Sequence, residues 1–428
     1  MNVLIIIIFF LLTFFLKNSS WGNAGLADGT ALGVGFILIV AFLFGKIITR
    51  WKLPMISGFI IGGALCGPYI LKLISVQQVK NLQLLDGLAL SLIALTAGGE
   101  LKLRQLRRRF KGIAAITFSQ TIFLIIGFVL FVFLAKSLFS FLPDNNFSQI
   151  LAFSLLLGVL AVATSPSTTI AIITETRAKG DLTDLVLSIT IIKDVLVIIL
   201  FALFLSFARF LTFPRHTFDV SFLLDLLRDI GGSFLFGGII GAGIIFYLKY
   251  IKAEITLFIL GISFFSYQIS YYFNFHPLLI CMVAGFLVEN FSAQGEGLIN
   301  AIENSSLPIY VIFFAISGAS LNLNILQNTW TVALLIVVLR ASFKFLGTYL
   351  GARFSGEEIN IQRLSWMGFI SQAGVALGMA IIIERTFPQW GAQFKALILA
   401  VIAINQIIGP ILLQRIIFQA GEAGKKEI

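Results

Sequence analysis

Two adjacent charged residues, Lys193 and Asp194, lie in the middle of a largely apolar stretch that runs from Leu185 to Phe207. A charged side chain at the centre of a bilayer costs roughly 2.5–3.5 kcal/mol on insertion scales, so it is retained where it faces a wet cavity or a partner. Asp194 is the only carboxylate that the sequence places deep inside such a stretch. We interpret it as a candidate site for a proton or a small ion. The alternative is a buried ion pair that only fixes helix packing.

The elements that must position this pair are membrane-spanning helices. Of the 428 residues, 58% are hydrophobic, whereas soluble domains have roughly 45–50%. We therefore predict an all-α polytopic membrane protein without a soluble domain. The net charge of +10 comes largely from basic residues at the ends of apolar stretches, and the densest run is Lys102 to Lys111. Such a run is typical of a cytoplasmic loop, so no nucleic-acid partner is expected, and an anionic-lipid site is the minor alternative.

Cysteine and histidine do not indicate a metal or redox site. Cys66 and Cys281 both fall within apolar stretches, and His216 and His276 lie at or just outside the ends of such stretches. The sequence contains neither a CxxC pair nor a Cys/His cluster, so we expect no disulfide framework, no bound metal of this kind and no cofactor.

The first residues have the features of a signal peptide. An apolar core from Val3 to Leu16 is short for a membrane span, and small residues follow near Ala24. Because no basic segment precedes the core, an extra, uncleaved N-terminal helix stays open as the alternative. We assign residues 1–24 to this leader or helix, residues 25–420 to a transmembrane domain and residues 421–428 to a short tail.

Thirteen apolar stretches follow, and most have the length that a bilayer requires. Their predicted bounds are Ala31–Ile48, Pro54–Ile74, Leu84–Leu101, Gly112–Ala135, Ser148–Ile173, Leu182–Phe207, Ser221–Leu248, Glu254–Phe273, His276–Glu289, Leu307–Leu323, Trp330–Arg353, Leu364–Glu384 and Phe394–Phe418. With the start of the first span outside, the cytoplasmic loops hold far more lysine and arginine than the external loops. The positive-inside rule then places the C-terminal tail in the cytoplasm. We expect a multi-pass protein of a bacterial inner membrane.

Two segments that lie seven spans apart resemble each other. ALTAGGELKLRQL, which ends at Leu106, is similar to FAISGASLNLNIL, which ends at Leu326, and Gly98 corresponds to Gly318. An offset of seven spans reverses the orientation, so the two halves are predicted to form inverted repeats. Such repeats, with a binding site near the bilayer midplane, are typical of secondary transporters.

Two spans that are also seven apart contain helix-disrupting residues. The fifth span contains ATSPSTT at positions 163–169, and the twelfth contains SQAGVALG at positions 371–378. Broken helices can present backbone carbonyls and half-helix ends to ions where they line a cavity. We predict two crossed broken helices, although either segment by itself could be a tolerated kink or a close packing position. The residues expected at these breaks are Pro166, Ser167, Thr168, Gln372 and Gly374.

Four parts of the chain resemble the monovalent cation:proton antiporter-2 family, of the Kef and bacterial sodium/proton exchanger type. They are RWKLPMISGFIIGGALCGPYIL, ATSPSTTIAIITETRAKGDLT, LSITIIKDVLVIILFAL, and LRASFKFLGTYLGARF with SQAGVALGMAI, and the resemblance covers roughly Ala31 to Phe418. It implies a homodimer with a moving core, at about residues 112–207 and 330–418, and a dimer scaffold formed by the remainder. The Kef-type C-terminal nucleotide-binding domain is expected to be absent, since the sequence stops soon after Phe418.

The resemblance also implies ion ligands. Asp194 matches the essential carboxylate that binds cation and proton alternately, and Thr190, one turn earlier, matches a hydroxyl ligand. Thr164 and Ser165 match ion-coordinating positions of the first broken helix, although many relatives have Asp where Ser165 stands. The one metal ion that this resemblance implies is a monovalent cation bound at Asp194.

Three basic residues are expected to compensate charge. Lys344 resembles a membrane-embedded lysine of the family, and Arg340 lies one turn away on the same helix face. Lys193 is a departure, because relatives carry Asp-Asp, Asn-Asp or Gln-Asp at this pair. We expect Lys344 to pair with Asp194 when no ion is bound, and Lys193 to tune the site or to contact the end of a broken helix.

We predict an antiporter that exchanges Na+ or K+ for H+ across a lipid bilayer, with Asp194 as the shared site. A single acid suggests the exchange of one charge for one, and therefore electroneutral transport. A cation-coupled solute carrier and a channel-like cation pathway are the alternatives within transport. An intramembrane enzyme would need a nucleophile with a base, or a metal cluster, and no histidine or cysteine accompanies Asp194 and Lys193.

Overall fold

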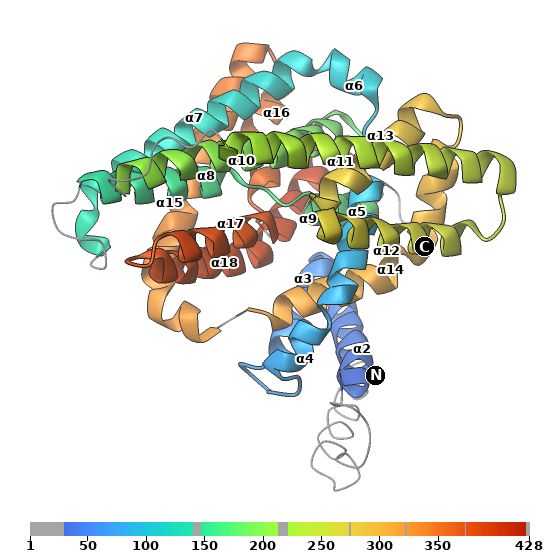
Figure 1. Ribbon diagram of the computed structural model, residues 1–428, viewed down its shortest axis with the longest axis horizontal. Helices are drawn as coiled ribbons and strands as arrows, with labels where there is room; N and C mark the ends of the chain where they lie inside the picture. The colour runs from blue at the N-terminus through green and yellow to red at the C-terminus, as the bar shows by residue number, and fades with distance from the viewer. Residues whose placement is uncertain are drawn as a thin grey trace, which may run out of the picture. The chain divides into compact units, whose positions relative to one another are not determined.

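The computed structural model describes residues 30–139, 147–212, 221–273, 275–321, 323–372 and 374–424, and within these ranges it contains helices and no strands (Figure 1). The predicted all-α fold is confirmed. The leader or helix predicted at residues 1–24 lies outside the described residues. The chain divides into two compact units, the first formed by residues up to Glu100, Ile170–Glu175 and Leu235–Asn324, and the second by Leu101–Thr169, Thr176–Phe234 and Ile325 onward.

The first unit is built from paired helices, of which α2 packs on α3, α3 on α14, and α5 on α13. Its helices are α2 (Thr30–Ile48), η3 (Thr49–Trp51), α3 (Met55–Cys66), α4 (Val76–Asn81), α5 (Gln83–Glu100), the π-helical turn η5 (Tyr247–Ile251), α12 (Ile255–Phe273), α13 (Pro277–Phe291) and α14 (Gly295–Ala319).

The two glycines that correspond in the predicted repeat make the same kind of contact in this unit. Gly98 of α5 abuts the carbonyl oxygen of Met282 on α13, and Gly318 of α14 abuts the carbonyl oxygen of Ile60 on α3. At both positions a Cβ atom would collide with the carbonyl, so close packing of the two helices requires glycine. This equivalence agrees with inverted repeats, which stay a prediction.

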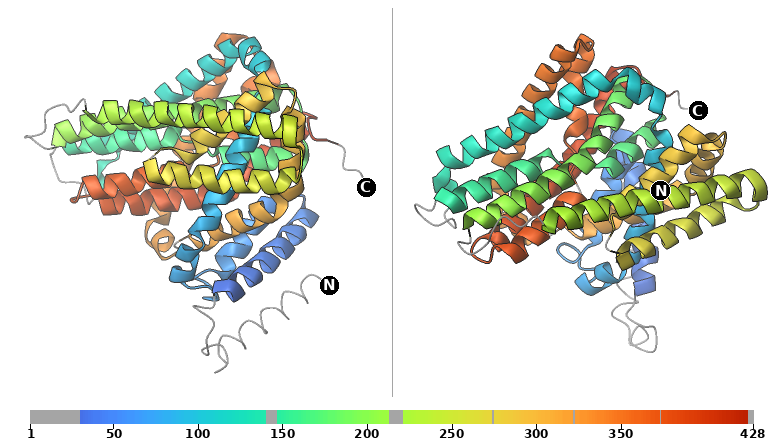
Figure 2. Two further views of the ribbon diagram at one scale, coloured as in Figure 1. Left: turned by 45° about the vertical axis from the view of Figure 1, so that its right-hand side comes forward. Right: turned by 45° about the horizontal axis from the view of Figure 1, so that its top comes forward.

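The second unit contains the longest helices. They are α6 (Leu103–Arg108), α7 (Phe110–Leu134), η4 (Lys136–Leu138), α8 (Phe147–Val162), α10 (Asp181–Thr212), α15 (Leu323–Ser355), α16 (Ile359–Leu364), η6 (Ser365–Phe369), α17 (Gly374–Thr386) and α18 (Gly391–Gln419). Helix α8 packs against both α7 and α10, and α17 runs beside α18 (Figure 2). Helices α9 (Pro166–Thr176) and α11 (Ser221–Phe246) contribute residues to both units.

An aromatic cluster holds α8 against α18 in the second unit. The ring of Phe153 lies 5.5 Å from that of Trp390 and 5.2 Å from that of Phe394, both in edge-to-face geometry. Such pairs add to the stabilisation that comes from burial itself. The part of α8 that precedes its end at Val162 is therefore anchored by packing.

Every predicted span overlaps a helix or a pair of helical segments, but some ends differ. Helix α3 ends at Cys66 rather than near Ile74, because Gly67 and Pro68 follow and proline cannot continue the helical hydrogen bonding. Helix α14 begins at Gly295, well before the predicted start at Leu307, since polar residues lower hydropathy without preventing a helix. Among the described residues, seven helices are long and apolar enough to span a membrane and four shorter ones are apolar. The count of thirteen spans stays a prediction.

Candidate ion-binding site

The first predicted break lies between α8 and α9. Residues 163–165 are not helical, and α9 begins at Pro166. The Oγ of Ser165 accepts a hydrogen bond from the backbone N–H of Thr168 (3.2 Å) and lies 3.0 Å from the Oγ of Ser167. A serine N-cap followed by proline is a favourable start for a helix. Ser165, an expected ion ligand, therefore caps α9.

The second predicted break lies between η6 and α17, where residues 370–372 are not helical and α17 begins at Gly374. The two breaks meet, because the backbone N–H of Ser165 donates to the carbonyl oxygen of Ser371 at 3.0 Å. Both predicted breaks are confirmed, and they lie together in the second unit.

Arg340 holds the ends of both broken helices. Its guanidinium donates hydrogen bonds to the carbonyl oxygens of Ala161 (2.9 Å), Ala163 (2.6 Å) and Ile370 (2.7 Å). The last carbonyls of a helix have no partner within the helix and carry partial negative charge. A buried guanidinium, which offers donors in a rigid fork, suits these acceptors.

Lys344, one turn further along α15, contacts the same region. Its Nζ donates to the carbonyl oxygen of Phe369 at 2.5 Å and lies 3.4 Å from that of Ala163. The expected ion pair between Lys344 and Asp194 is absent among the described residues, because the ammonium is directed to these carbonyls instead.

Gln372 connects the second break to two neighbouring helices. Its side-chain Nε2 donates to the carbonyl oxygen of Leu160 near the end of α8 (2.8 Å), and its Oε1 accepts from the Nδ2 of Asn405 on α18 (3.1 Å). Asn405 was not predicted from the sequence. A polar residue inside the apolar stretch AVIAINQIIG was the signal that could have identified it.

Asp194 and Thr190 lie one turn apart on α10, and therefore on the same face of the helix. The side chain of Asp194 is 7% exposed, and among the described residues it forms no hydrogen bond or ion pair. The hydroxyl of Thr190, and that of Thr164 in the first break, are buried and have no hydrogen-bond partner there. The described part of the chain holds no cluster of three or more metal-ligating acidic, histidine or cysteine residues. The arrangement offers one carboxylate and unpaired hydroxyl oxygens, which are ligands that a hard cation prefers.

Lys193 is fully buried beside the second break. Its Nζ donates to the Oε1 of Gln120 on α7 and lies 4.8 Å from the centre of the Phe369 ring. Among the described residues, Arg340 and Lys344 rather than Lys193 donate to the carbonyls at the helix ends. The contact of Lys193 with the end of η6 is therefore with the ring of Phe369 and not with a carbonyl. Gln120 was not predicted from the sequence, although a glutamine inside the apolar stretch ITFSQTIFL was a signal.

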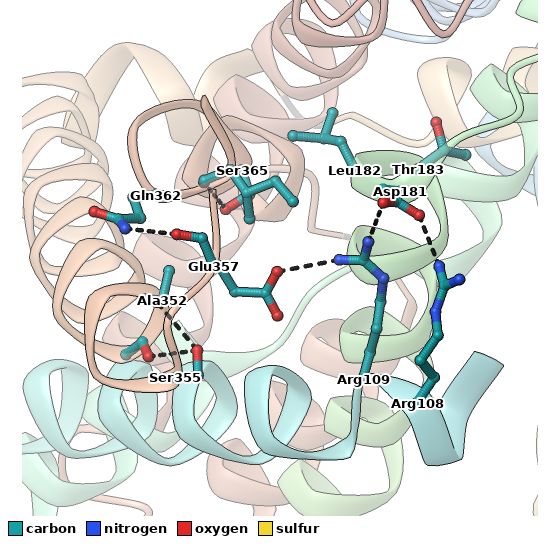
Figure 3. A network of polar contacts seen from close by, with 12 residues as sticks. Arg108, Arg109, Asp181, Leu182, Thr183, Ala352, Ser355, Glu357, Gln362 and Ser365 are labelled. Carbon is teal, nitrogen blue, oxygen red and sulfur yellow. Dashed lines mark hydrogen bonds and ion pairs between the residues drawn. The ribbon is translucent and has the colours of Figure 1, made fainter. Parts of the chain in front are cut away.

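The basic run in front of α7 takes part in an ion-pair network (Figure 3). Arg109 donates to Glu357 in the α15–α16 connection at 3.1 Å and also contacts Asp181, the first residue of α10. Arg108 donates to Asp181 at 2.9 Å. The run therefore connects the starts of α7 and α10 to the end of α15, and α10 is the helix that carries Asp194.

Two broken helices meet in this helical membrane protein, and α10, which packs against α8, η6 and α17, carries a buried carboxylate that has no partner among the described residues. This is the architecture of an ion-coupled secondary transporter. The model of the family described as "Sodium/hydrogen exchanger, transmembrane" matches residues 35–419, and the chain belongs to this family.

Individual relatives agree with the family. The chain is 22% identical to "Probable Na(+)/H(+) antiporter 3" of Methanocaldococcus jannaschii, over 89% of the chain and 95% of that protein. It is 25% identical to "Na(+)/H(+) antiporter NhaS4" of Synechocystis sp., over 77% and 83%. The solved structure of the sodium proton antiporter MjNhaP1 from Methanocaldococcus jannaschii has a TM-score of 0.69 at 20% identity, over 92% of this chain and 97% of that one, and shows the same fold. The expected antiporter-2 branch is not confirmed, because the family assignment lies closer to the antiporter-1 branch.

Proposed function

We propose that the protein exchanges a monovalent cation, Na+ or K+, for H+ across the cell membrane, and that Asp194 is the shared site. The ionised carboxylate binds the cation, and protonation releases it. The observation that carries this proposal is that Asp194 is buried without a partner among the described residues, while Arg340, Lys344 and Lys193 have partners of their own. Na+ is the first cation to test, since the relatives are named Na+/H+ antiporters.

The hydroxyls of Thr190 and Thr164 are proposed to complete the oxygen ligands of the cation. Both are buried and lack a hydrogen-bond partner among the described residues, so binding an ion would offset the cost of their burial. Ser165 already caps α9, and we assign it to shaping the break rather than to direct ligation.

Exchange is proposed to be electroneutral, because one carboxylate can exchange one monovalent cation for one proton. All the candidate residues lie in the second unit, which overlaps the predicted moving core of residues 112–207 and 330–418. We propose that this unit moves, that the remainder forms the scaffold of a homodimer, and that the C-terminal tail lies in the cytoplasm.

The test is exchange by purified protein in liposomes that carry an acid interior and a pH-sensitive dye. Addition of Na+, K+ or Li+ should dissipate the pH gradient of the wild type. Asp194→Asn preserves side-chain shape and should abolish the response, whereas Asp184→Asn, near the start of the same helix, should retain it. Exchange by Asp194→Asn would show that the site is wrongly assigned. Cation flux without proton movement would favour the channel-like alternative.

A further inference from the structure

We propose that Gln120 is a positioning residue that keeps the ammonium of Lys193 away from Asp194 and thereby sets the affinity for the transported cation. This inference rests on the proposed function of Asp194. Gln120 is 0% exposed on α7, and its Oε1 accepts the hydrogen bond from the Nζ of Lys193. Neither Arg340 nor Lys344 shares this acceptor, since both donate to backbone carbonyls.

Thr348 determines which way the Gln120 amide faces. The hydroxyl of Thr348 donates its proton to the carbonyl oxygen of Lys344 at 2.6 Å, so towards Gln120 it can only accept. Gln120 therefore presents its Nε2 to Thr348 and its Oε1 to Lys193. The chain of hydrogen bonds joins α7, α10 and α15.

The backbone of Gln120 is held in place as well. Gly347 on α15 packs so closely against the Cα of Gln120 that a Cβ atom there would collide with it. Phe369 contributes its ring 4.8 Å from the Nζ of Lys193. The Gln120 amide and the Phe369 ring therefore define the position of the Lys193 ammonium, and neither group carries a negative charge.

Asp194 is the residue after Lys193, and adjacent side chains leave a helix in different directions, so the ammonium can reach Asp194 only when its flexible side chain is released from Gln120. The restrained ammonium leaves the carboxylate open to an incoming cation. A lysine side chain is flexible, and without the Gln120 acceptor its buried ammonium lacks an oxygen partner. The carboxylate of Asp194, which has no partner in the described part of the chain, is the acceptor that the ammonium would turn towards, and the ammonium would then compete with the transported cation.

The test measures KM and maximal rate for Na+ in the liposome assay. Gln120→Ala should raise KM about tenfold, equivalent to about 1.4 kcal/mol, with a smaller change in maximal rate. The decisive comparison is made in a Lys193→Asn background, where Gln120→Ala should leave KM unchanged because there is no ammonium to restrain. An equal rise in KM in both backgrounds would overturn the proposal.

Matched variants separate this role from a structural one. Thr348→Val should raise KM in the same direction, and Thr348→Ser, which retains the hydroxyl, should behave as the wild type. If Gln120→Ala does not fold, the KM of Thr348→Val, measured with and without Lys193→Asn, provides the same comparison of two backgrounds. Gln149→Ala removes a buried glutamine of α8 that contacts Gln389 and should not change KM.

The two proposals fail in different ways. If exchange survives Asp194→Asn, both the proposed ion site and the proposed role of Gln120 are refuted. If Asp194→Asn is inactive while Gln120→Ala leaves KM unchanged, or while the effects of Gln120→Ala and Lys193→Asn simply add, the ion site stands and only the role of Gln120 is refuted.

Discussion

Replacing Arg340 with methionine should strongly destabilise the protein. The side chain is 1% exposed and donates three hydrogen bonds to carbonyl oxygens at the two breaks. Each buried carbonyl left without a partner costs about 1–3 kcal/mol. Lys344 already lies 3.4 Å from the carbonyl of Ala163 and could replace part of one bond. We therefore take the lower half of the summed cost for the three carbonyls, about 3–6 kcal/mol. This loss is comparable with a total stability of about 5–15 kcal/mol.

The assay measures the apparent melting temperature of detergent-purified protein, by following the monodisperse peak in size-exclusion chromatography after heating. Arg340→Met should lower it by more than about 5 °C or abolish the monodisperse peak. Arg340→Lys should be intermediate, because one ammonium cannot reproduce the fork that contacts three carbonyls. Arg353→Met is the matched control, since Arg353 is exposed on the same helix and should have little effect.

Equal melting of Arg340→Met and Arg353→Met would refute the reasoning. It would mean that the carbonyls at the breaks are satisfied without the guanidinium. Arg340 would then be retained for transport, and the exchange assay would show a defect in a fully stable protein.

Two further predictions concern the ends of the second unit. Glu422 accepts hydrogen bonds from the backbone N–H groups of Leu182 (2.8 Å) and Thr183 (2.7 Å), so Glu422→Ala should lose a helix cap worth about 1 kcal/mol and Glu422→Gln less. The same melting assay measures this, and identical melting of the alanine variant and wild type would contradict it. The side chain of Arg108 is 66% exposed, and Arg108→Cys should resist an impermeant thiol reagent added outside intact cells, because the basic run is predicted to be cytoplasmic. Ready labelling from outside would show that the predicted orientation is the wrong way round.

Local chemistry explains which features could be predicted. The helices follow from long apolar stretches, since only internally hydrogen-bonded segments are stable in a bilayer. The first break follows from Ser165 and Pro166, because a serine cap and a proline that lacks an N–H start a new helix wherever they stand. Asp194 could be singled out because a carboxylate in an apolar span is costly.

Only the tertiary structure decided which partners the three buried cations take. Arg340, Lys344 and Lys193 are long, flexible side chains, and each could in principle have reached a carboxylate, a carbonyl or an amide. The choice depends on where segments distant in sequence meet: Arg340 and Lys344 lie at carbonyls of both breaks, and Lys193 lies at Gln120. By itself the sequence determined the helices, the breaks and the lone acid, because these depend on neighbouring residues. The folded chain determined that the acid has no partner within the described ranges, because that depends on contacts between residues far apart along the chain.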